Sequence, residues 1–277
     1  MGLVAGSREA LERGVRAVNH ARPWRREIAV WGKRVRVSSL DRCIYAYLHR
    51  WGIMGAPERR ALRSVITPGM RTVDVGANIG LYTLYLAELV RSTGRVFAFE
   101  PEPDLYARLQ ENCALNGAHH VRTFNFALGR QAGRSMLHRS SLNSGDNRLG
   151  PRTDASSLVE VPVVSLDEVL ANEHVDFIKI DVQGHELAVL QGMAHVCRSN
   201  PALRIYFEFS PPRPGVEGDR AVVEYLWQEQ FRIFHFQGDR WAPLRAWDEV
   251  LVAVRPKSFA NLLAVRGELS TTTGDWA

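Results

Sequence analysis

The chain has 277 residues, of which 45% are hydrophobic and 23% are charged, a balance typical of a folded globular protein and not of a disordered or fibrous one. Its formal net charge is +5, with 35 Lys and Arg against 30 Asp and Glu. These basic residues form no long run with interleaved aromatic residues, so we expect no nucleic-acid partner.

The first 68 residues predict an N-terminal cap of helices and a hairpin. A helix is expected near Arg8 to Val18, followed by a hairpin over Ile28 to Val37 with a Trp-Gly-Lys turn. Two further helical segments end before Pro68 and Gly69. Such a cap can close over a substrate at the carboxyl ends of the sheet strands, or it can cover a sheet edge. The pattern leaves both alternatives open.

Residues 69–277 predict one catalytic domain with a mostly parallel sheet. Short β-rich runs alternate with helical patterns, as in βαβ units. Between the first two strands, leucines at 81, 84, 86 and 89 recur at near-helical spacing. The seven expected strands are Arg71 to Val75, Arg95 to Glu100, Val121 to Ala127, Val175 to Asp181, Leu203 to Phe209, Phe231 to Phe236 and Glu249 to Val254.

A polar segment over residues 131–164 interrupts this alternation between the third and fourth strands. It is rich in Ser, Asn, Gly and Arg. Long insertions of this kind in compact domains are usually functional or disordered. We therefore expect it to contribute to the site or to lack fixed structure.

Cysteine use and hydropathy bear on the compartment. The three cysteines, Cys43, Cys113 and Cys197, form no C-x-x-C pair, which favours a reducing cytoplasm over a zinc or redox site. No stretch approaches the roughly 18 consecutive apolar residues of a membrane span, so we expect no membrane partner. Residues 1–40 lack the apolar core of a signal peptide.

The strongest motif is the glycine-spaced turn within Val73 to Gly80, which joins a strand to a helix. Gly76 and Gly80 are expected to let the backbone approach a ligand closely, and the helix start offers free N–H donors. A nucleotide-like ligand is indicated. A dinucleotide-binding fold would use the same device for a pyrophosphate.

Two acids separate these alternatives. Asp74 is expected inside the turn, where its carboxylate would repel a pyrophosphate and attract the ammonium of a methionine moiety. Glu100 ends the second strand, where an acid can accept both hydroxyls of a ribose. The third glycine of the dinucleotide fingerprint is missing. These features favour a methyl-donor site over an NAD site.

With these motifs the chain resembles the FkbM-type family of S-adenosylmethionine-dependent methyltransferases. The resemblance covers roughly residues 66 to 211 and rests on Val73 to Tyr82, Phe99 to Pro101, Asn116-Gly117, Asn125 to Gly129, Asn143 to Arg148, Ser165 to Glu168 and Asp176 to Glu186. It implies a class I methyltransferase fold, an α/β Rossmann-like architecture with S-adenosylmethionine as cofactor and S-adenosylhomocysteine as product. The cofactor contacts that it implies are at Asp74, Gly76, Ala77, Asn78, Gly80 and Glu100, with the adenine near Asn125 and Ala127.

Two residues are candidates for proton removal from the acceptor. Asp181 ends the fourth strand, at the edge where the donor methyl is expected, and His185 follows at a helix start. Asp181 could orient His185 or act directly; alternatively, Asp181 caps the helix and His185 is an exposed residue. The chain also departs from the family at Gln183, where an acid is usual, so any role that needs a carboxylate there is in doubt.

The acceptor side is assigned to the polar insertion and the fifth strand. Its candidates are Asn143, Asp146, Asn147, Arg148 and Glu208. A divalent metal held by Asp181, Glu208 and an acid of the insertion is left open, because oxygen ligands suit Mg²⁺, but none is expected.

The sequence thus predicts O-methylation of a hydroxyl on a small acceptor such as a sugar, a polyketide or another natural product. N-methylation of an amine or a protein side chain is the alternative, and a cofactor-binding partner subunit without catalysis is another. A homodimer is left open.

Overall fold

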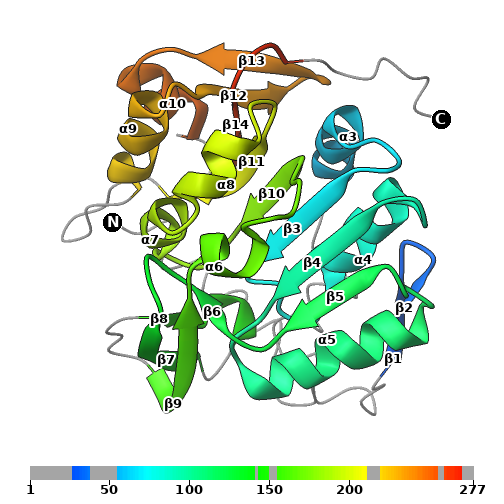
Figure 1. The fold of residues 1–277 in the computed structure, drawn as a ribbon. Coiled ribbons are helices and arrows are strands. Elements are labelled where there is room, and N and C mark those ends of the chain that lie inside the picture. The colour runs from blue at the N-terminus through cyan, green and yellow to red at the C-terminus, as the bar shows by residue number, and fades with distance from the viewer. Residues whose placement is uncertain are drawn as a thin grey trace, which may run out of the picture.

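The computed structural model describes residues 27–37, 55–140, 143–149, 155–210, 219–254 and 259–269. Its centre is an eight-stranded mixed sheet (Figure 1). The strands in spatial order are β13 (Arg240–Leu244), β12 (Arg232–Gln237), β14 (Ala260–Val265), β11 (Arg204–Phe209), β10 (Phe177–Ile180), β3 (Arg71–Val75), β4 (Arg95–Phe99) and β5 (Val121–Phe124). The strands β11, β10, β3, β4 and β5 are mutually parallel, and β14, β12 and β13 join antiparallel. This is the class I methyltransferase fold that the sequence predicts.

The last predicted strand is wrong. Residues Glu249 to Val254 belong to a helix, α10 (Trp247–Val254). Val250 and Val254 are fully buried while Val252 is 60% exposed, which is the spacing of one helix face and not of one strand face. Two strands that the sequence does not predict complete the sheet: β14 lies between β11 and β12, and β13 forms the edge beside β12. The sheet therefore has eight strands and not seven.

Helices cover both faces of the sheet. The face that carries Val96, Phe177 and Leu263 packs against α3 (Ala56–Val65) and α4 (Leu81–Val90), and α5 (Pro103–Leu115) packs beside α4. The opposite face, which carries Ile178 and Phe207, forms the largest core. Its helices are α6 (Leu166–Leu170), α7 (Glu186–Gln191), α8 (Ala194–Ser199), α9 (Arg220–Gln228) and α10. None of the helices in the described part of the chain is long and apolar enough to cross a membrane.

The polar insertion is a folded unit. It contains β7 (Gly133–Ser140), the 3₁₀ turn η1 (Ser144–Asp146), β8 (Arg148–Leu149) and β9 (Ala155–Val164), which together with β6 (Ala127–Leu128) form a four-stranded sheet. Leu137, Val161 and Val163 give this sheet a small core of its own. The four strands lie beyond the carboxyl ends of β3 and β4 (Figure 1), so the insertion borders the ligand side of the main sheet.

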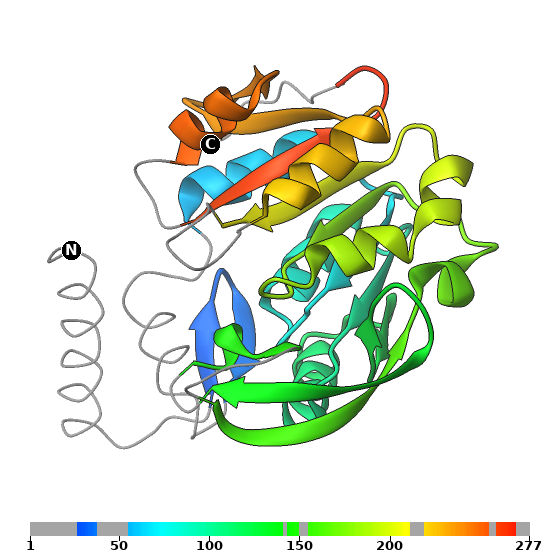
Figure 2. The ribbon, with the colours of Figure 1, turned by 90° about the vertical axis from the view of Figure 1, so that its left-hand side faces the viewer.

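The predicted hairpin of the N-terminal cap is confirmed as β1 (Glu27–Val30) and β2 (Lys33–Arg36). Trp31 and Gly32 both have positive φ, as a tight two-residue turn between twisted strands requires. The hairpin packs on α5 and not on a sheet edge (Figure 2), because Asn112 accepts a hydrogen bond from the Arg36 N–H at 2.7 Å. One of the two further helical segments is α3; the helix at Arg8 to Val18 and the other segment lie outside the described residues.

Candidate active site

A cavity of about 1060 Å³ lies at the carboxyl ends of β3, β4, β10 and β11. The strand order reverses between β3 and β10, since the chain proceeds from β3 to β4 on one side and β10 leads to β11 on the other. In open α/β sheets, ligands bind at such a switch point. Residues from the glycine turn, the insertion, α3 and the antiparallel strands all line this one cavity.

The glycine turn is fixed by its packing against protein atoms. Gly76 has φ of +78°, and a Cβ there would lie 2.0 Å from the backbone oxygen of Asp181. Gly80 has φ of +93°, and a Cβ there would lie 2.7 Å from Leu109 Cδ1. Contacts within the protein thus require both glycines, in addition to the approach of a ligand that the sequence predicts. They allow the turn to pack on the loop after β10 and on α5, which leaves Ala77 and Asn78 at the cavity wall.

Glu100 lies at the cavity wall directly after β4 and is only 5% exposed. Its Oε2 accepts a hydrogen bond from the Asn78 N–H at 2.7 Å, and its Oε1 accepts one from the Glu102 N–H at 2.9 Å. Burial raises the pKa of Glu100 to about 7 although both backbone donors oppose the shift. Each carboxylate oxygen retains further acceptor capacity, so Glu100 can still receive the hydroxyls of a ribose.

Asp74 lies in β3 and not in the turn, which corrects its predicted position. Its side chain is fully buried and is not among the residues that line the cavity. Its Oδ2 accepts a hydrogen bond from Thr83 Oγ1 at 2.6 Å, and its Oδ1 lies 3.4 Å from Lys179 Nζ. Asp74 thus does not reach the cavity directly and is connected to it through its ion pair with Lys179.

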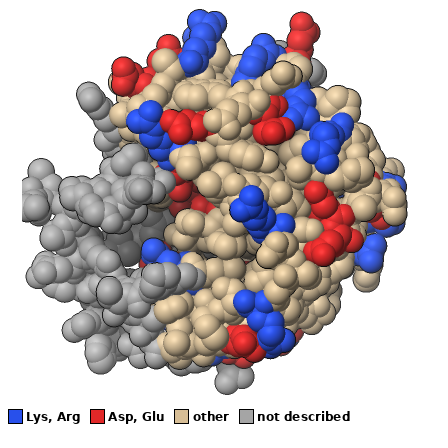
Figure 3. Space-filling view, turned by 60° about the vertical axis from the view of Figure 1, so that its left-hand side comes forward, with Lys and Arg blue, Asp and Glu red and all other residues tan. Residues whose placement is uncertain are grey.

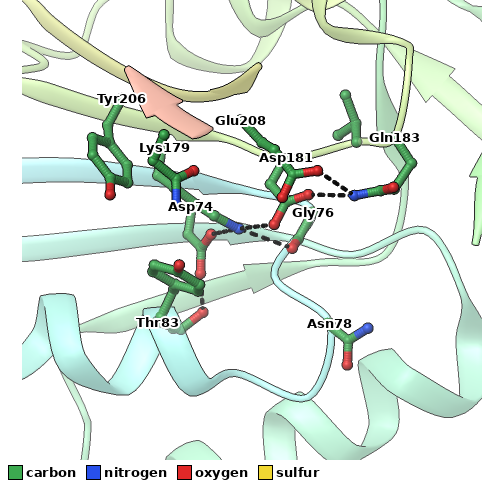
Figure 4. Close-up of polar contacts among 12 residues, drawn as sticks. Asp74, Gly76, Asn78, Thr83, Lys179, Asp181, Gln183, Tyr206 and Glu208 are labelled. Carbon is green, nitrogen blue, oxygen red and sulfur yellow. Dashed lines mark hydrogen bonds and ion pairs between the residues drawn. The ribbon is translucent and has the colours of Figure 1, made fainter. Parts of the chain in front are cut away.

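Lys179 is the central cation of the site, and the sequence analysis missed it. It lies opposite both Asp74 and Tyr206 in the register of β3, β10 and β11. Its Nζ lies 3.4 Å from Asp181 Oδ2 and 3.4 Å from the oxygen of Gly76 (Figure 4). Burial lowers the pKa of Lys179, but the charges of Asp74 and Asp181 together outweigh it and the pKa is raised. The ammonium stays charged at neutral pH.

A period of two along neighbouring strands could have revealed Lys179. In a β-strand, residues two positions apart point to the same face of the sheet. Polar residues stand at such spacing in Lys179 and Asp181, and again in Tyr206 and Glu208. Buried polar residues at alternate positions of hydrophobic strands indicate a functional row.

Gln183 joins two carboxyl groups. Its Nε2 donates to Asp181 Oδ1 at 2.9 Å and to Glu208 Oε1 at 3.1 Å (Figure 4). Burial, followed by the charge of Asp181, raises the pKa of Glu208 to about 8, so Glu208 is mainly protonated at neutral pH. Gln183, the residue that departs from the family pattern, thus lies between Asp181 and the largely protonated Glu208.

The structure does not pair Asp181 with His185, which is one of the alternatives that the sequence leaves open. The contacts of Asp181 are with Lys179 and Gln183. His185 is half-buried at the start of α7 and lies near Gly129, where a Cβ would be 3.3 Å from His185 Nε2. Burial lowers the pKa of His185, which leaves the imidazole neutral at pH 7. Both residues line the cavity, Asp181 directly after β10 and His185 at the start of α7.

The predicted adenine residues divide between wall and support. Ala127 lines the cavity with its neighbours Phe126 and Leu128, which form an apolar surface. Asn125 does not line the cavity. Its Nδ2 donates to the backbone oxygen of Glu100 at 2.9 Å and to that of Pro101 at 3.1 Å. Asn125 therefore holds the loop that carries Glu100.

The predicted acceptor residues Asn143, Asp146, Asn147, Arg148 and Glu208 all line the same cavity. The insertion residues approach it from the glycine-turn side, because Asn78 Nδ2 donates to Ser144 Oγ at 3.2 Å. Asn143 accepts from the Gly145 N–H at 3.1 Å, and this bond shapes the insertion loop. Glu208 stands on β11 beside Asp181, on the main sheet.

The cap contributes one acid that sequence reasoning also missed. Glu58 on α3 lines the cavity, and three donors converge on its Oε1: Tyr82 Oη at 2.5 Å, Asn261 Nδ2 at 2.6 Å and Tyr206 Oη at 3.1 Å. Burial raises the pKa of Glu58.

Within the described residues, no group of three or more His, Cys, Asp or Glu side chains is arranged to hold a metal ion. On the face shown in Figure 3, basic and acidic side chains are interspersed.

The chain is similar in sequence to known methyltransferases. Residues 74–233 match the methyltransferase FkbM domain. The chain is 30% identical over 129 residues to hexuronic acid methyltransferase AglP of Haloferax volcanii, an alignment that covers 46% of this chain and 51% of the relative. It is 31% identical over 159 residues to the 31-O-demethyl-FK506 methyltransferase FkbM of Streptomyces tacrolimicus, covering 46% of this chain and 61% of that protein. The chain thus spans little more than half the length of these relatives. A solved S-adenosylmethionine-dependent methyltransferase of Aquifex aeolicus aligns with a TM-score of 0.46 at 14% identity, over 80% of this chain and 93% of that one.

Proposed function

Because the chain belongs to the methyltransferase FkbM family, we propose that it transfers the methyl group of S-adenosylmethionine to a hydroxyl oxygen of a small acceptor. The acceptor class is a sugar, a polyketide ring or a related natural product, in keeping with the relatives named for a hexuronic acid and for FK506. One observation carries the proposal: Glu100 and Asp181, at the ends of two strands next to β3, line the same cavity.

The residues of the cavity fit the cofactor. Glu100 is a buried carboxylate that suits a pair of ribose hydroxyls, and the backbone of Ala77 and Asn78 lies beside it. Phe126 and Leu128 supply an apolar wall that suits a purine ring. When bound, S-adenosylmethionine supplies an electrophilic methyl group on a positively charged sulfur.

Asp181 is the proposed proton acceptor. An alcohol oxygen becomes an ether only if its proton leaves, and a positioned carboxylate can accept that proton. Lys179 and Gln183 fix both oxygens of Asp181 from the protein side. Glu208, largely protonated, can donate a hydrogen bond and hold the acceptor next to Asp181. Positioning of this kind can remove about 7 to 11 kcal/mol from the activation barrier. A general base typically accelerates a reaction about 10²- to 10⁴-fold, which corresponds to a smaller reduction of the barrier.

Calorimetric titration with S-adenosylhomocysteine tests the cofactor half of the proposal. The wild-type protein is expected to bind, and Glu100→Ala to bind at least about tenfold more weakly, because an ionic hydrogen bond to a hydroxyl is lost. Glu224→Ala, which removes an exposed acid on α9, is the matched control. Absence of binding to the folded wild-type protein, or equal binding by Glu100→Ala, would rule out the proposed cofactor site.

N-methylation is the second candidate, favoured by the three carboxyl groups of Glu58, Asp181 and Glu208 on one cavity. An uncharged amine could donate a hydrogen bond to one of these groups and present its lone pair to the methyl donor. The two reactions are separated by the product, since an N-methyl and an O-methyl carbon have distinct NMR shifts.

A further inference from the structure

A second polar cluster, apart from Asp181, Gln183 and Glu208, lies in the part of the cavity formed by α3, α4, β11 and β14. We define it as the Glu58 cluster, and its members are Glu58, Tyr82, Tyr206 and Asn261. We infer that the Glu58 cluster binds a second hydroxyl of the methyl acceptor, and that this acceptor is an uncharged, polyhydroxylated ring. The inference rests on the proposed function, but Glu58 and Asn261 lie outside the residues that match the family.

The hydrogen bonds of the cluster leave one carboxylate oxygen for a ligand. Tyr82, Tyr206 and Asn261 all donate to Oε1 of Glu58. Among the described residues, no donor is paired with Oε2. The three bonds hold the carboxylate in one orientation while its second oxygen, with two lone pairs, can accept a hydroxyl proton.

The cluster lies within reach of the same small molecule as Asp181. Lys179 Nζ is 3.4 Å from Asp181 Oδ2 and 4.4 Å from the centre of the Tyr82 ring. The hydroxyl of that ring is bonded to Glu58. Glu58 and Asp181 are thus linked through the Tyr82 ring and the Lys179 ammonium, and both line the same cavity. Two hydroxyls of one ring-shaped acceptor are therefore expected to reach them together.

The charges around this part of the cavity disfavour an anionic acceptor. Glu58 and Asp181 face the cavity, and the ammonium of Lys179 is already shared between Asp74 and Asp181. The other cation among the described lining residues, Arg148, belongs to the insertion on the glycine-turn side. A carboxylate on the acceptor would therefore meet repulsion without a cation to offset it.

An ammonium group would also find little to attract it. The ammonium of Lys179 already takes up the charge of Asp181, and Glu208 is mainly neutral at pH 7. The walls next to Asn261 are aromatic, since Phe236 and Phe259 line the same cavity. Polar planar side chains combined with aromatic faces suit a ring that carries hydroxyls at its edge and C–H groups on its face.

Four matched pyranosides test the inference with labelled S-adenosylmethionine as donor: methyl glucopyranoside, its uronate, its uronamide and its 2-amino analogue. The uronamide matches the uronate in size but has no charge. We expect kcat/KM for the uronamide to exceed that for the uronate at least about tenfold. Glu58→Gln should raise KM for methyl glucopyranoside about tenfold and narrow the ratio between uronamide and uronate, with unchanged affinity for S-adenosylhomocysteine.

The decisive measurement is the ratio of kcat/KM for the uronamide to kcat/KM for the uronate. A merely structural role of Glu58 would not change this preference for an uncharged acceptor. Glu224→Gln is the matched control and should leave KM and the ratio as in the wild type. Tyr206→Phe removes one donor to Glu58 and should raise KM less than Glu58→Gln, which provides a second variant if Glu58→Gln does not fold.

Several results would overturn the inference. They are a uronate used as well as the uronamide, methylation of the amine nitrogen, an unchanged ratio in Glu58→Gln, or no transfer to any of the four pyranosides by a protein that binds S-adenosylhomocysteine. In all of these the proposed cofactor site survives. Failure to bind S-adenosylhomocysteine would instead defeat the proposed function itself.

Discussion

Lys179 and Asp74 lie opposite each other on β10 and β3, and the Lys179 Nζ is 3.4 Å from Asp74 Oδ1. Their side chains are 5% and 0% exposed, so this is a buried ion pair. The same ammonium lies 3.4 Å from Asp181 Oδ2. The pair therefore connects the interior of the sheet to the proposed proton acceptor at its edge.

Lys179→Met should strongly destabilise the fold, because it leaves Asp74 as a buried charge without a cation. Loss of one partner from a buried pair costs about 3 to 5 kcal/mol, which urea unfolding followed by circular dichroism can measure. The double variant Asp74→Asn with Lys179→Met removes both charges and should recover part of this loss. Equal stability of Lys179→Met and the wild type would show that the pair contributes nothing.

Asp181→Asn should leave the affinity for S-adenosylhomocysteine largely intact and lower turnover at least about tenfold, since the amide cannot accept the acceptor proton. Single-turnover methyl transfer to an acceptor used by the wild-type protein measures this. Glu224→Gln serves as the control. Wild-type turnover in Asp181→Asn would remove Asp181 from the mechanism and direct attention to His185.

Glu208 should make stability depend on pH. Its pKa is raised to about 8 from the ordinary 4.5, so the folded state holds the proton more tightly than the unfolded state. The resulting stabilisation is complete below about pH 4.5 and is lost as pH rises through about 8. Relative to Glu208→Gln, the wild-type free energy of unfolding should fall by up to about 1.4 kcal/mol per pH unit within this window. Parallel curves for the two proteins between pH 5 and 8 would contradict the shift.

Gly76→Ala should disrupt the glycine turn. The new Cβ would lie 2.0 Å from the oxygen of Asp181, and the residue has φ of +78°. Gly267→Ala is the matched control, because Gly267 has φ of +80° with no atom within 4 Å of the added Cβ. The control should lose only the about 1 to 2 kcal/mol of a left-handed conformation. Thermal unfolding should show a clearly larger loss for Gly76→Ala; equal losses would mean that the turn moves freely.

Cofactor affinity should fall as the solution is acidified through neutral pH. The pKa of Glu100 is raised to about 7 by burial, and a protonated carboxyl accepts hydroxyl hydrogen bonds less well than a carboxylate. Calorimetric titration with S-adenosylhomocysteine at pH 6 and pH 8 should therefore give weaker binding at pH 6. In Glu100→Gln this difference should largely disappear, and its persistence would place the titrating group elsewhere.

The alternation of strands and helices was predictable because each element leaves a local mark. The strands β3, β4 and β10 are short runs that are almost wholly buried, as in parallel strands covered on both faces, and α4 is a longer apolar run after β3. Each of these marks lies in residues close together in the chain. Glu249 to Val254 failed because a short apolar run fits both periods. Only the burial of Val250 and Val254 around an exposed Val252 distinguishes the helix.

The sequence by itself determined the family, the glycine turn and the acids at the strand ends, Glu100 and Asp181, because these lie in contiguous motifs whose local spacing carries the information. Tertiary structure alone decided what surrounds them. It buried Asp74 against Lys179 from a strand about a hundred residues away in the chain, and it brought Glu58 from the cap to Asn261 near the opposite end. Contacts between residues so distant along the chain arise from sheet order and helix packing, and no local pattern encodes them.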